Sequence, residues 1–295
     1  MRKKVIQVDT KDFFKLFKVE ITLLVDLVAV AAFFSNPLFP TKLVLVAPLL
    51  VSGTLASMSA GLFNNIYDRD IDTKMERTAY RWKLINDSNL KQFSVLAALM
   101  VGASFIISYI FINLLTALLI FSGFLAYVVL YTIVLKRRTS WNIVLGGIAG
   151  SFPALAGWST LSDSLSITAY FIAFLVFLWT PTHFWNLATS HAEEYKKANV
   201  PMLPAVVSRT KSEFYVLLSS IVLVVYSLIP LAVRSINVGI LYYGFAVVMG
   251  GVIVYTAVKP LISPVSVNFF KKSFGFTNFY LLILLISISL VSIVR

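Results

Sequence analysis

Long apolar runs separated by shorter polar segments make up most of this chain. A helix needs about 20 predominantly apolar residues to cross the hydrocarbon of a bilayer. On that measure the sequence predicts nine membrane-spanning helices, at residues 19–36, 42–63, 93–112, 115–135, 142–161, 167–187, 214–234, 238–258 and 275–294. The pattern therefore predicts an all-α, multi-pass membrane protein, with residues 1–295 forming a single domain.

Composition supports this interpretation and excludes some chemistry. The chain is 59% hydrophobic and only 13% charged, whereas soluble domains carry about 25% charged residues. It contains no cysteine, so disulfides, thiolate metal sites and cysteine catalysis are excluded. Residues 1–19 lack a continuous apolar stretch before a small-residue cleavage site, so we expect no removable signal peptide.

The basic residues predict how the helices are oriented. The net charge is +12, and in a membrane protein an excess of Lys and Arg marks the cytoplasmic loops. With nine spans and the N-terminus inside, the loops on the cytoplasmic side hold 22 of the 25 Lys and Arg residues. The cytoplasmic segments would be 1–18, 64–92, 136–141, 188–213 and 259–274. We therefore expect a cell-membrane protein with a cytoplasmic N-terminal segment.

The segment 64–77 directly follows the second predicted span and carries four of the thirteen acidic residues. Asn64, Asp68 and Asp72 are spaced four apart, which places them on one face of a helix. Asp70 lies about 200° from Asp68 on such a helix and should point elsewhere. Mg²⁺ typically binds through one or two carboxylates together with substrate phosphates. This face is therefore a candidate metal site, although a solvated helix at the membrane surface has the same spacing.

Basic side chains near this face are candidates for binding an anion. Lys74 and Arg77 follow about one turn later and could contact the phosphates of a bound substrate. The triplet Lys136-Arg137-Arg138 ends the fourth predicted span on the same side of the membrane. It is either an anchor of the positive-inside kind or an anion clamp opposite the acidic face.

A second long polar loop follows the sixth predicted span and is expected on the same membrane face. It contains the acidic pair Glu193 and Glu194, and both histidines of the chain, His183 and His191, lie in or beside it. Ionisable groups at membrane depth are functional candidates. His183 could therefore be a metal ligand, a base or an interfacial residue.

The acidic motif resembles the first aspartate motif of UbiA-type intramembrane prenyltransferases. Further strings are similar to one branch of that family, the protohaem IX farnesyltransferases (haem O synthases). They are Asn65 to Thr78, Leu135-Lys136-Arg137-Arg138-Thr139, Asn142 to Gly147, Gly157-Trp158, Trp179-Thr180-Pro181-x-His183-Phe184-Trp185 and Pro201-Met202-Leu203-Pro204. The chain departs from the branch at Glu193-Glu194 (usually Asp-Asp), at His191 (commonly Arg) and at Lys18-Val19-Glu20 (usually Lys-Pro-Arg).

The resemblance implies a reaction and roles for particular residues. The reaction is Mg²⁺-dependent transfer of a farnesyl group from farnesyl diphosphate to a vinyl group of protohaem IX, with addition of water, giving haem O and diphosphate. The helices would enclose a central apolar cavity open to the cytoplasmic side, and haem A synthase is implied as a partner. The implied roles are catalysis for Asn64, Asp68 and Asp72, Mg²⁺ binding for these three and Glu194, diphosphate binding for Lys74, Arg77, Arg137 and Arg138, haem binding for His183 and Trp185, and cavity lining for Tyr131 and Trp158.

Other functions remain open on the residues alone. A UbiA-type enzyme acting on an aromatic quinone precursor would share the metal–diphosphate site but would need no haem contact. A secondary transporter of an anionic substrate would also use intramembrane charges, but it would place them near the midplane of the bilayer. A membrane protein that binds haem or assists assembly without catalysis is a third alternative.

Overall fold

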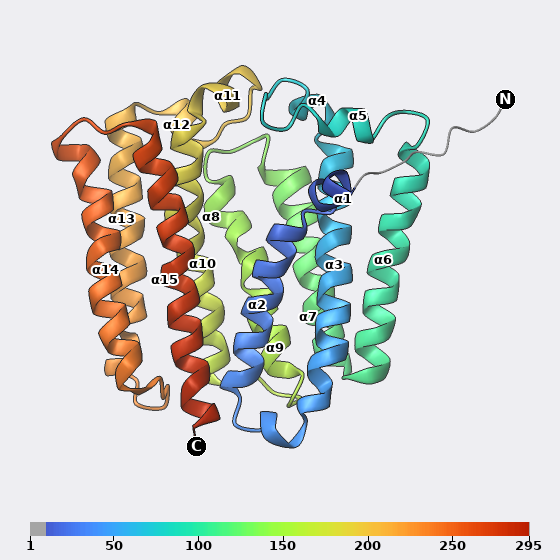
Figure 1. The fold of residues 1–295 in the computed structure, drawn as a ribbon, viewed down its shortest axis with the longest axis vertical. Helices are drawn as coiled ribbons and strands as arrows, with labels where there is room; N and C mark the ends of the chain where they lie inside the picture. The colour runs from blue at the N-terminus through green and yellow to red at the C-terminus, as the bar shows by residue number, and fades with distance from the viewer. Residues whose placement is uncertain (1–9, 295) are drawn as a thin grey trace.

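The computed structural model describes residues 10–294, and every regular element in that part of the chain is a helix (Figure 1). The α-helices are α1 (Thr10–Leu16), α2 (Val19–Ser35), α3 (Val46–Tyr67), α4 (Arg69–Asp72), α5 (Arg81–Leu84), α6 (Leu90–Phe111), α7 (Leu114–Leu125), α8 (Asn142–Gly146), α9 (Phe152–Ser159), α10 (Ile167–Ser190), α11 (Ala192–Lys197), α12 (Leu203–Val206), α13 (Arg209–Ser227), α14 (Gly239–Ile262) and α15 (Val267–Ile293). Short 3₁₀ turns are η1 (Phe39–Thr41), η2 (Leu43–Leu45), η4 (Gly147–Gly150) and η5 (Ile229–Leu231), and η3 (Ala126–Leu135) is a π-helix.

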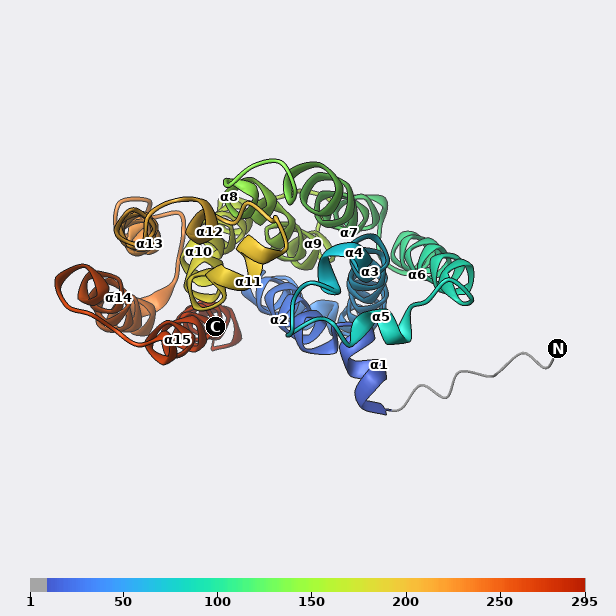
Figure 2. The ribbon, with the colours of Figure 1, turned by 90° about the horizontal axis from the view of Figure 1, so that it is seen from above.

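The long helices and the shorter α9 pack side by side, and α10 also packs on α15 and α2 on α9. Contacts run in order through α2, α3, α6, α7, α9, α10, α13, α14 and α15, and α15 returns to α2. Figure 2 shows this arrangement from above, with α2 and α10 near the middle. Four of the short helices, α4, α5, α11 and α12, lie at the same end of the long helices (Figure 1). We call this end of the bundle the polar end.

Seven helices of the described part are long and apolar enough to cross a membrane. The other two predicted spans correspond to α2, which has 17 residues, and to the segment 142–159, which is divided into α8, η4 and α9. The all-helical, multi-pass prediction is confirmed, while the count of nine crossings stays a prediction. The expectation of one continuous helix over 142–161 is wrong.

Glycine and proline explain why that segment is broken. A Cβ atom on Gly146 would lie 2.5 Å from the ring of Tyr131, and one on Gly147 would lie 3.1 Å from Thr180. The backbone here packs closely on side chains of η3 and α10, with no room for a Cβ atom at Gly146 and little at Gly147. Pro153 then lies in the first turn of α9, where its missing N–H costs nothing. The chain therefore passes through three short helices in this layer.

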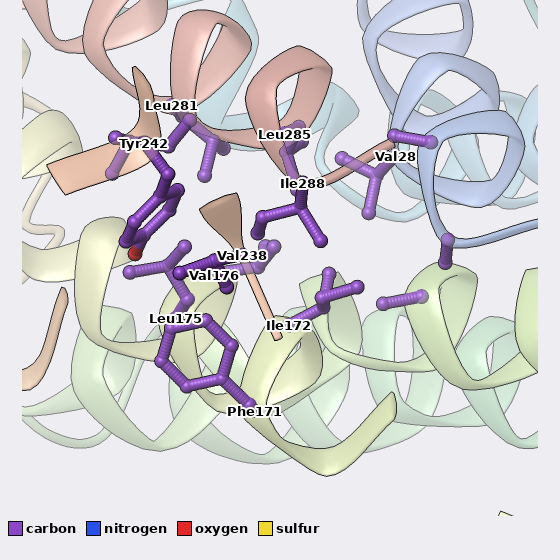
Figure 3. Packing of buried hydrophobic residues seen from close by; sticks show 14 of the residues in the cluster. Val28, Phe171, Ile172, Leu175, Val176, Val238, Tyr242, Leu281, Leu285 and Ile288 are labelled. Carbon is purple, nitrogen blue, oxygen red and sulfur yellow. The ribbon is translucent and has the colours of Figure 1, made fainter. Parts of the chain in front are cut away.

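The largest apolar cluster lies among α10, α14 and α15, with Val28 contributed by α2 (Figure 3). The side chains of Phe171, Tyr242 and Leu284 are almost fully buried there. The hydroxyl of Tyr242 donates to the carbonyl of Ser227 at 2.8 Å, so its polar atom is satisfied. This cluster fixes α10 against α15, and both helices continue from it toward the polar end.

The fourth predicted span, 115–135, changes helix type in its second half. α7 passes into the π-helix η3, whose hydrogen bonds join residues five apart, as the N–H of Lys136 does to the carbonyl of Tyr131 at 2.8 Å. π-helical turns are rare in proteins, and those that occur often lie at functional sites. This one ends directly at the basic triplet that begins with Lys136.

Candidate active site

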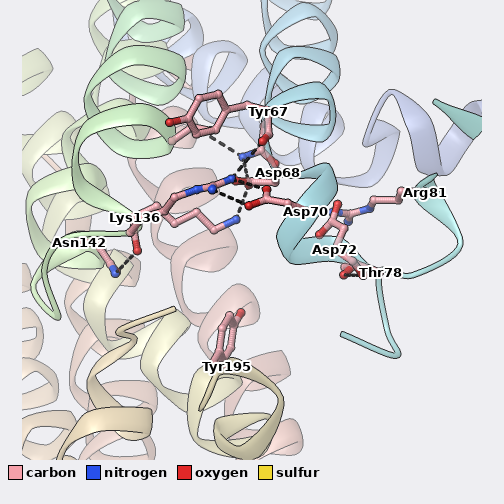
Figure 4. Close-up of polar contacts among 12 residues, drawn as sticks. Tyr67, Asp68, Asp70, Asp72, Thr78, Arg81, Lys136, Asn142 and Tyr195 are labelled. Atoms are coloured by element: carbon pink, nitrogen blue, oxygen red, sulfur yellow. Dashed lines mark hydrogen bonds and ion pairs between the residues drawn. The ribbon is translucent and has the colours of Figure 1, made fainter. Parts of the chain in front are cut away.

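Two carboxylates are buried where α3 ends at the polar end (Figure 4). Asp68 follows the last residue of α3, and its N–H donates to the carbonyl of Asn64 at 2.9 Å. The N–H of Asp72 in turn donates to the carbonyl of Asp68 at 2.8 Å, so a single helical turn separates the two acids. Asp68 is 1% and Asp72 3% exposed. The backbone thus keeps the three residues at successive turns, as their spacing predicted, and the side chains of Asn64 and Asp68 are hydrogen-bonded.

Cations from separate parts of the chain pair with these carboxylates. Lys136 forms an ion pair with Oδ2 of Asp68, and Nη2 of Arg137 lies 3.4 Å from Oδ1 of the same residue. Nη1 of Arg81, on α5, lies 3.2 Å from Oδ2 of Asp72. An unpaired buried carboxylate is costly, so each acid is compensated here. The sequence indicated Lys136 only as part of a possible anion clamp, and it gave no indication of Arg81.

Lys18 is a further basic residue beside the site. It lies between α1 and α2 in a left-handed backbone conformation, with φ of 50°. Its ammonium group donates to Oδ1 of Asn64 and to the hydroxyl of Tyr127, the latter at 3.3 Å. The available signal was its place in Lys18-Val19-Glu20, where the similar family has Lys-Pro-Arg.

The amide of Asn64 is oriented differently from the expected metal ligand. Its nitrogen, Nδ2, donates to Oδ2 of Asp68 at 2.7 Å, while its oxygen accepts from Lys18. A metal ligand would have to present the oxygen, because the amide N–H groups are donors only. In this arrangement Asn64 therefore acts on Asp68 as a hydrogen-bond donor.

Asp70 points away from the buried pair, as its position predicts. Its side chain is 62% exposed and forms two hydrogen bonds with Arg137, at 2.7 and 2.8 Å. These hydrogen bonds lower the pKa of Asp70 below its usual value. The guanidinium of Arg137 also lies over the ring of Tyr67, 4.7 Å from its centroid. Asp70 and Tyr67 thus hold Arg137 at the edge of the site.

The four expected diphosphate ligands are placed unevenly. Arg137 contacts the acidic cluster, but Lys74 and Arg138 are exposed side chains outside it. Nη2 of Arg77 lies 3.5 Å from the hydroxyl of Tyr195 on α11. This contact joins the two long polar loops, which the sequence placed on one membrane face.

Glu194 lies on α11, in the second of these loops. Nδ1 of His191 lies 2.8 Å from its Oε1, and Oε2 has no hydrogen-bond partner in the described part of the chain. Burial acts to raise the pKa of Glu194, but His191 and the positive charge of Arg77 outweigh it and lower this pKa. No three Asp, Glu or His side chains among the described residues come close enough to form a metal site. Glu194 therefore does not complete a cluster with Asp68 and Asp72.

His183 lies on α10, facing α15. Its ring stacks between Trp179 and Phe274, with centroid distances of 4.1 and 4.0 Å. Its Nδ1 lies 2.7 Å from Oγ1 of Thr277, and that hydroxyl donates its single hydrogen to the carbonyl of Phe274 at 2.7 Å. Nδ1 of His183 must therefore be the donor to Thr277. In the neutral ring, Nε2 is then left as an acceptor.

Trp185, the other expected haem contact, does not lie beside His183. Its ring packs against Trp141, which precedes α8, and against Tyr215 of α13, both with centroid distances of 6.3 Å. Residues two apart on a helix point about 200° apart. The structure therefore places the two side chains on different sides of α10, and haem binding by both stays a prediction.

The two expected cavity aromatics lie at different depths. Tyr131 belongs to η3 near the acidic pair, with its ring 5.7 Å from that of Tyr127. Trp158 is buried on α9, and its carbonyl accepts from Asn36, which follows the last residue of α2. Since α2 starts near the polar end, Trp158 lies toward the opposite end of the bundle.

Two pockets lie elsewhere on the bundle. One, of about 570 Å³, has a nearly apolar lining from α9, α10 and the end of α13. The other, of about 300 Å³, lies at the polar end among α11, α12, α13 and α15. Neither is lined by Asp68 or Asp72, so the expected central cavity stays a prediction.

Charge defines what the acidic cluster can bind. Four cations surround the two buried carboxylates; they are Lys18, Arg81, Lys136 and Arg137. Arg presents a planar fork of donors that matches phosphate oxygens, and Lys adds a compact charge. The cluster is therefore suited to a phosphate-bearing anion that binds together with a cation. The basic side chains would contact the phosphate oxygens, and the carboxylates would contact the cation.

Known proteins are similar to this chain in sequence or in fold. A protein of Picrophilus torridus named "Protoheme IX farnesyltransferase 2" is 50% identical over 96% of this chain and 98% of its own. Cenarchaeum symbiosum has "Protoheme IX farnesyltransferase 1", 38% identical over 83% of this chain and 81% of its own. Among solved structures, a UbiA homolog from Aeropyrum pernix K1 has a TM-score of 0.72 at 18% identity, covering 94% of this chain and 98% of that one. A UbiA homolog from Archaeoglobus fulgidus bound to DMAPP and Mg²⁺ has a TM-score of 0.67 at 16% identity, covering 95% and 99%.

Fold and site together define a helical membrane protein that presents buried carboxylates and cations at one end of its bundle. The chain belongs to the UbiA prenyltransferase family, whose model matches residues 23–290.

Proposed function

We propose that this chain transfers a farnesyl group from farnesyl diphosphate to a vinyl group of protohaem IX, with addition of water, giving haem O and diphosphate. The observation that carries the donor half is the buried Asp68–Asp72 pair with four cations around it. The acceptor half is supported by the relatives named protoheme IX farnesyltransferase, at 50% and 38% identity.

The cations act on the leaving group. Breaking the allylic C–O bond leaves the bonding electrons, and so negative charge, on diphosphate. Lys136, Arg137 and Arg81 lie where preorganised positive charge stabilises this product of cleavage more than the intact ester. Charges that are already fixed by partners need little reorganisation as the bond breaks.

The buried donor set fits Mg²⁺. Asp68 and Asp72 supply two carboxylates one helical turn apart, and Mg²⁺ is commonly held by one or two carboxylates with substrate phosphates completing its shell. Bound there, Mg²⁺ would supply Lewis-acid neutralisation of the diphosphate charge. Asn64 would hold Asp68 in place. Glu194, on α11, does not form a three-residue cluster with Asp68 and Asp72 among the described residues.

The acceptor must meet the allylic cation before water does. In the coupling step, the allylic C–O bond between farnesyl and diphosphate breaks, and a new bond forms between the farnesyl carbon and the vinyl carbon of the haem. A cation remains beside the porphyrin; water adds to it and releases a proton. His183 is the group proposed to contact the haem, because its Nε2 is an acceptor and neutral imidazole is a common axial ligand.

The polar end is proposed to face the cytoplasm. Of the 25 Lys and Arg residues, 22 fall in the segments expected on that side, and the short helices α4, α5 and α11 belong to those segments. Both water-soluble components of the reaction, diphosphate and Mg²⁺, would then exchange with the cytoplasm.

The test is an assay of purified protein with farnesyl diphosphate, Mg²⁺ and protohaem, followed by mass spectrometry of the extracted haem. The expected product is heavier than protohaem by one farnesyl group plus water. A parallel reaction supplies a phenolic acid in place of haem. Prenylation of the phenolic acid with no change in haem would assign the chain to the quinone-precursor branch. If both acceptors stay unmodified while farnesyl diphosphate is bound, the chain is not a transferase for either.

A further inference from the structure

Thr132 links the π-helix η3 to the acidic cluster. It is fully buried, and its hydroxyl has two hydrogen-bond partners. Oγ1 lies 3.1 Å from Nδ2 of Asn64 and 2.9 Å from the carbonyl oxygen of Tyr127. Asn64 itself is 3% exposed and bonds to Asp68 and Lys18.

The donors and acceptors in this network fix the orientation of the Asn64 amide. A carbonyl only accepts, so the single hydrogen of the Thr132 hydroxyl is used on Tyr127, and Oγ1 must accept from Asn64. Asn64 therefore turns its nitrogen toward Thr132 and Asp68. The ammonium of Lys18 only donates, which requires the amide oxygen on the other side. A flipped amide would place two donors together at Lys18 and two acceptors together at Asp68.

The π-helix makes this contact possible. Tyr127 and Lys136 are nine residues apart, which in an α-helix is about 900°, placing them on opposite faces. Here Tyr127 contacts Lys18, and Lys136 pairs with Asp68, so both face the same cluster. The wider turn, closed by bonds between residues five apart, removes most of that rotation. Thr132 lies between them on this shared face.

We infer that Thr132 is a positioning residue, whose hydroxyl holds the Asn64 amide with its nitrogen on Asp68 and its oxygen on Lys18. Asn64 then keeps Oδ2 of Asp68 engaged, together with Lys136. Oδ1, whose contact is the longer one of 3.4 Å to Arg137, is left as the oxygen for a ligand. Asn64 thus acts on Asp68 as a hydrogen-bond donor that orients this carboxylate.

The activity readout of this inference rests on the proposed function, so Mn²⁺ binding is measured as an independent readout. Thr132→Val keeps the shape and removes the hydroxyl; Thr132→Ser keeps the hydroxyl. Mn²⁺ affinity is measured by electron paramagnetic resonance with a non-reactive prenyl diphosphate analogue, and kcat and KM for farnesyl diphosphate are measured separately. We expect T132V to weaken Mn²⁺ binding by roughly tenfold, the equivalent of one buried hydrogen bond, and T132S to bind as the wild type does.

Equal Mn²⁺ affinity in T132V and wild type would overturn the inference, as would a loss that T132S does not restore. An inactive wild type that still shows these affinities would contradict only the proposed function.

A double-mutant cycle with Asn64→Leu gives a second test. If Thr132 acts through Asn64, T132V has no further effect on Mn²⁺ affinity in the N64L background, and additive losses would contradict the inference. Should T132V not fold, T132C keeps the size with a weakly bonding thiol and takes its place in both comparisons.

Discussion

Arg81 and Asp72 are joined across the start of the loop that follows α3, with Nη1 of Arg81 3.2 Å from Oδ2 of Asp72. The side chains are 16% and 4% exposed, so this is a largely buried pair. Arg81 lies on the short helix α5, nine residues beyond Asp72, and it brings that helix against the carboxylate. The loop after α3 is thereby part of the site and not only a connection to α6.

Arg81→Gln is predicted to weaken use of the prenyl diphosphate. It removes a cation from a nearly buried carboxylate and from the proposed diphosphate site, at a cost of about 2 kcal/mol, or roughly thirtyfold in kcat/KM. Arg69→Gln is the matched control, since Arg69 pairs at 3.0 Å with Asp87, whose side chain is 95% exposed. Such a surface pair contributes about 0–1 kcal/mol. The measurement is kcat/KM from steady-state kinetics with varied farnesyl diphosphate. Equal kcat/KM values in R81Q and R69Q would contradict the role of Arg81.

Gly157→Ala is predicted to disrupt the packing of α9 on α2. The new Cβ atom would lie 2.0 Å from the carbonyl oxygen of Ala29, which is backbone and cannot move aside. We expect a loss of about 3 kcal/mol in the free energy of unfolding. Gly102→Ala on α6 is the control, because nothing lies within 4 Å of its Cβ, and alanine favours a helix by about 0.5–1 kcal/mol. Thermal unfolding in detergent compares the two, and a fully stable G157A would show that α2 and α9 do not approach this closely.

His183→Leu is predicted to impair haem binding while leaving the KM for farnesyl diphosphate unchanged. The leucine removes the Nε2 acceptor, and we expect haem affinity to fall by roughly tenfold, with a shift in the Soret absorbance. His191→Leu provides the comparison with the other histidine, which bonds to Glu194 at the polar end. Haem titration followed by absorbance gives the result. An unchanged Soret band in H183L would remove His183 from the acceptor site.

The acidic face could be predicted because its information is local. α3 ends at Tyr67 and α4 follows at Arg69–Asp72, but backbone hydrogen bonds from Asp68 to Asn64 and from Asp72 to Asp68 keep the four-residue spacing. Asn64 and Asp68 contact each other as a result. Asp70 likewise points outward, as a separation of two residues requires. The all-helical fold followed in the same way from runs of apolar residues long enough to span a bilayer.

The sequence indicated the triplet Lys136-Arg137-Arg138 as a possible clamp opposite this face, but the contacts of the face with Lys18, Tyr127 and Arg81 could not be read from it. The π-helix has no marker in the sequence, and α-helical geometry would put Tyr127 on the face opposite Lys136. Lys18 contacts Asn64 across 46 residues of sequence, and it does so from a left-handed backbone conformation between α1 and α2. These contacts depend on how α1, α2 and η3 pack around α3. The helix break at Gly147 is similar, since it depends on the close approach of Thr180.

The proposed function depends most on Asp68. Asp68→Asn keeps the size and removes the charge of the residue that pairs with Lys136 and, in the proposed function, holds Mg²⁺; Asp70→Asn makes the same change two residues away, at an exposed side chain. The direct measurement is mass spectrometry of haem after incubation with farnesyl diphosphate and Mg²⁺. We predict that the farnesyl-plus-water product disappears in D68N and remains in D70N. Full product formation by D68N would contradict the account.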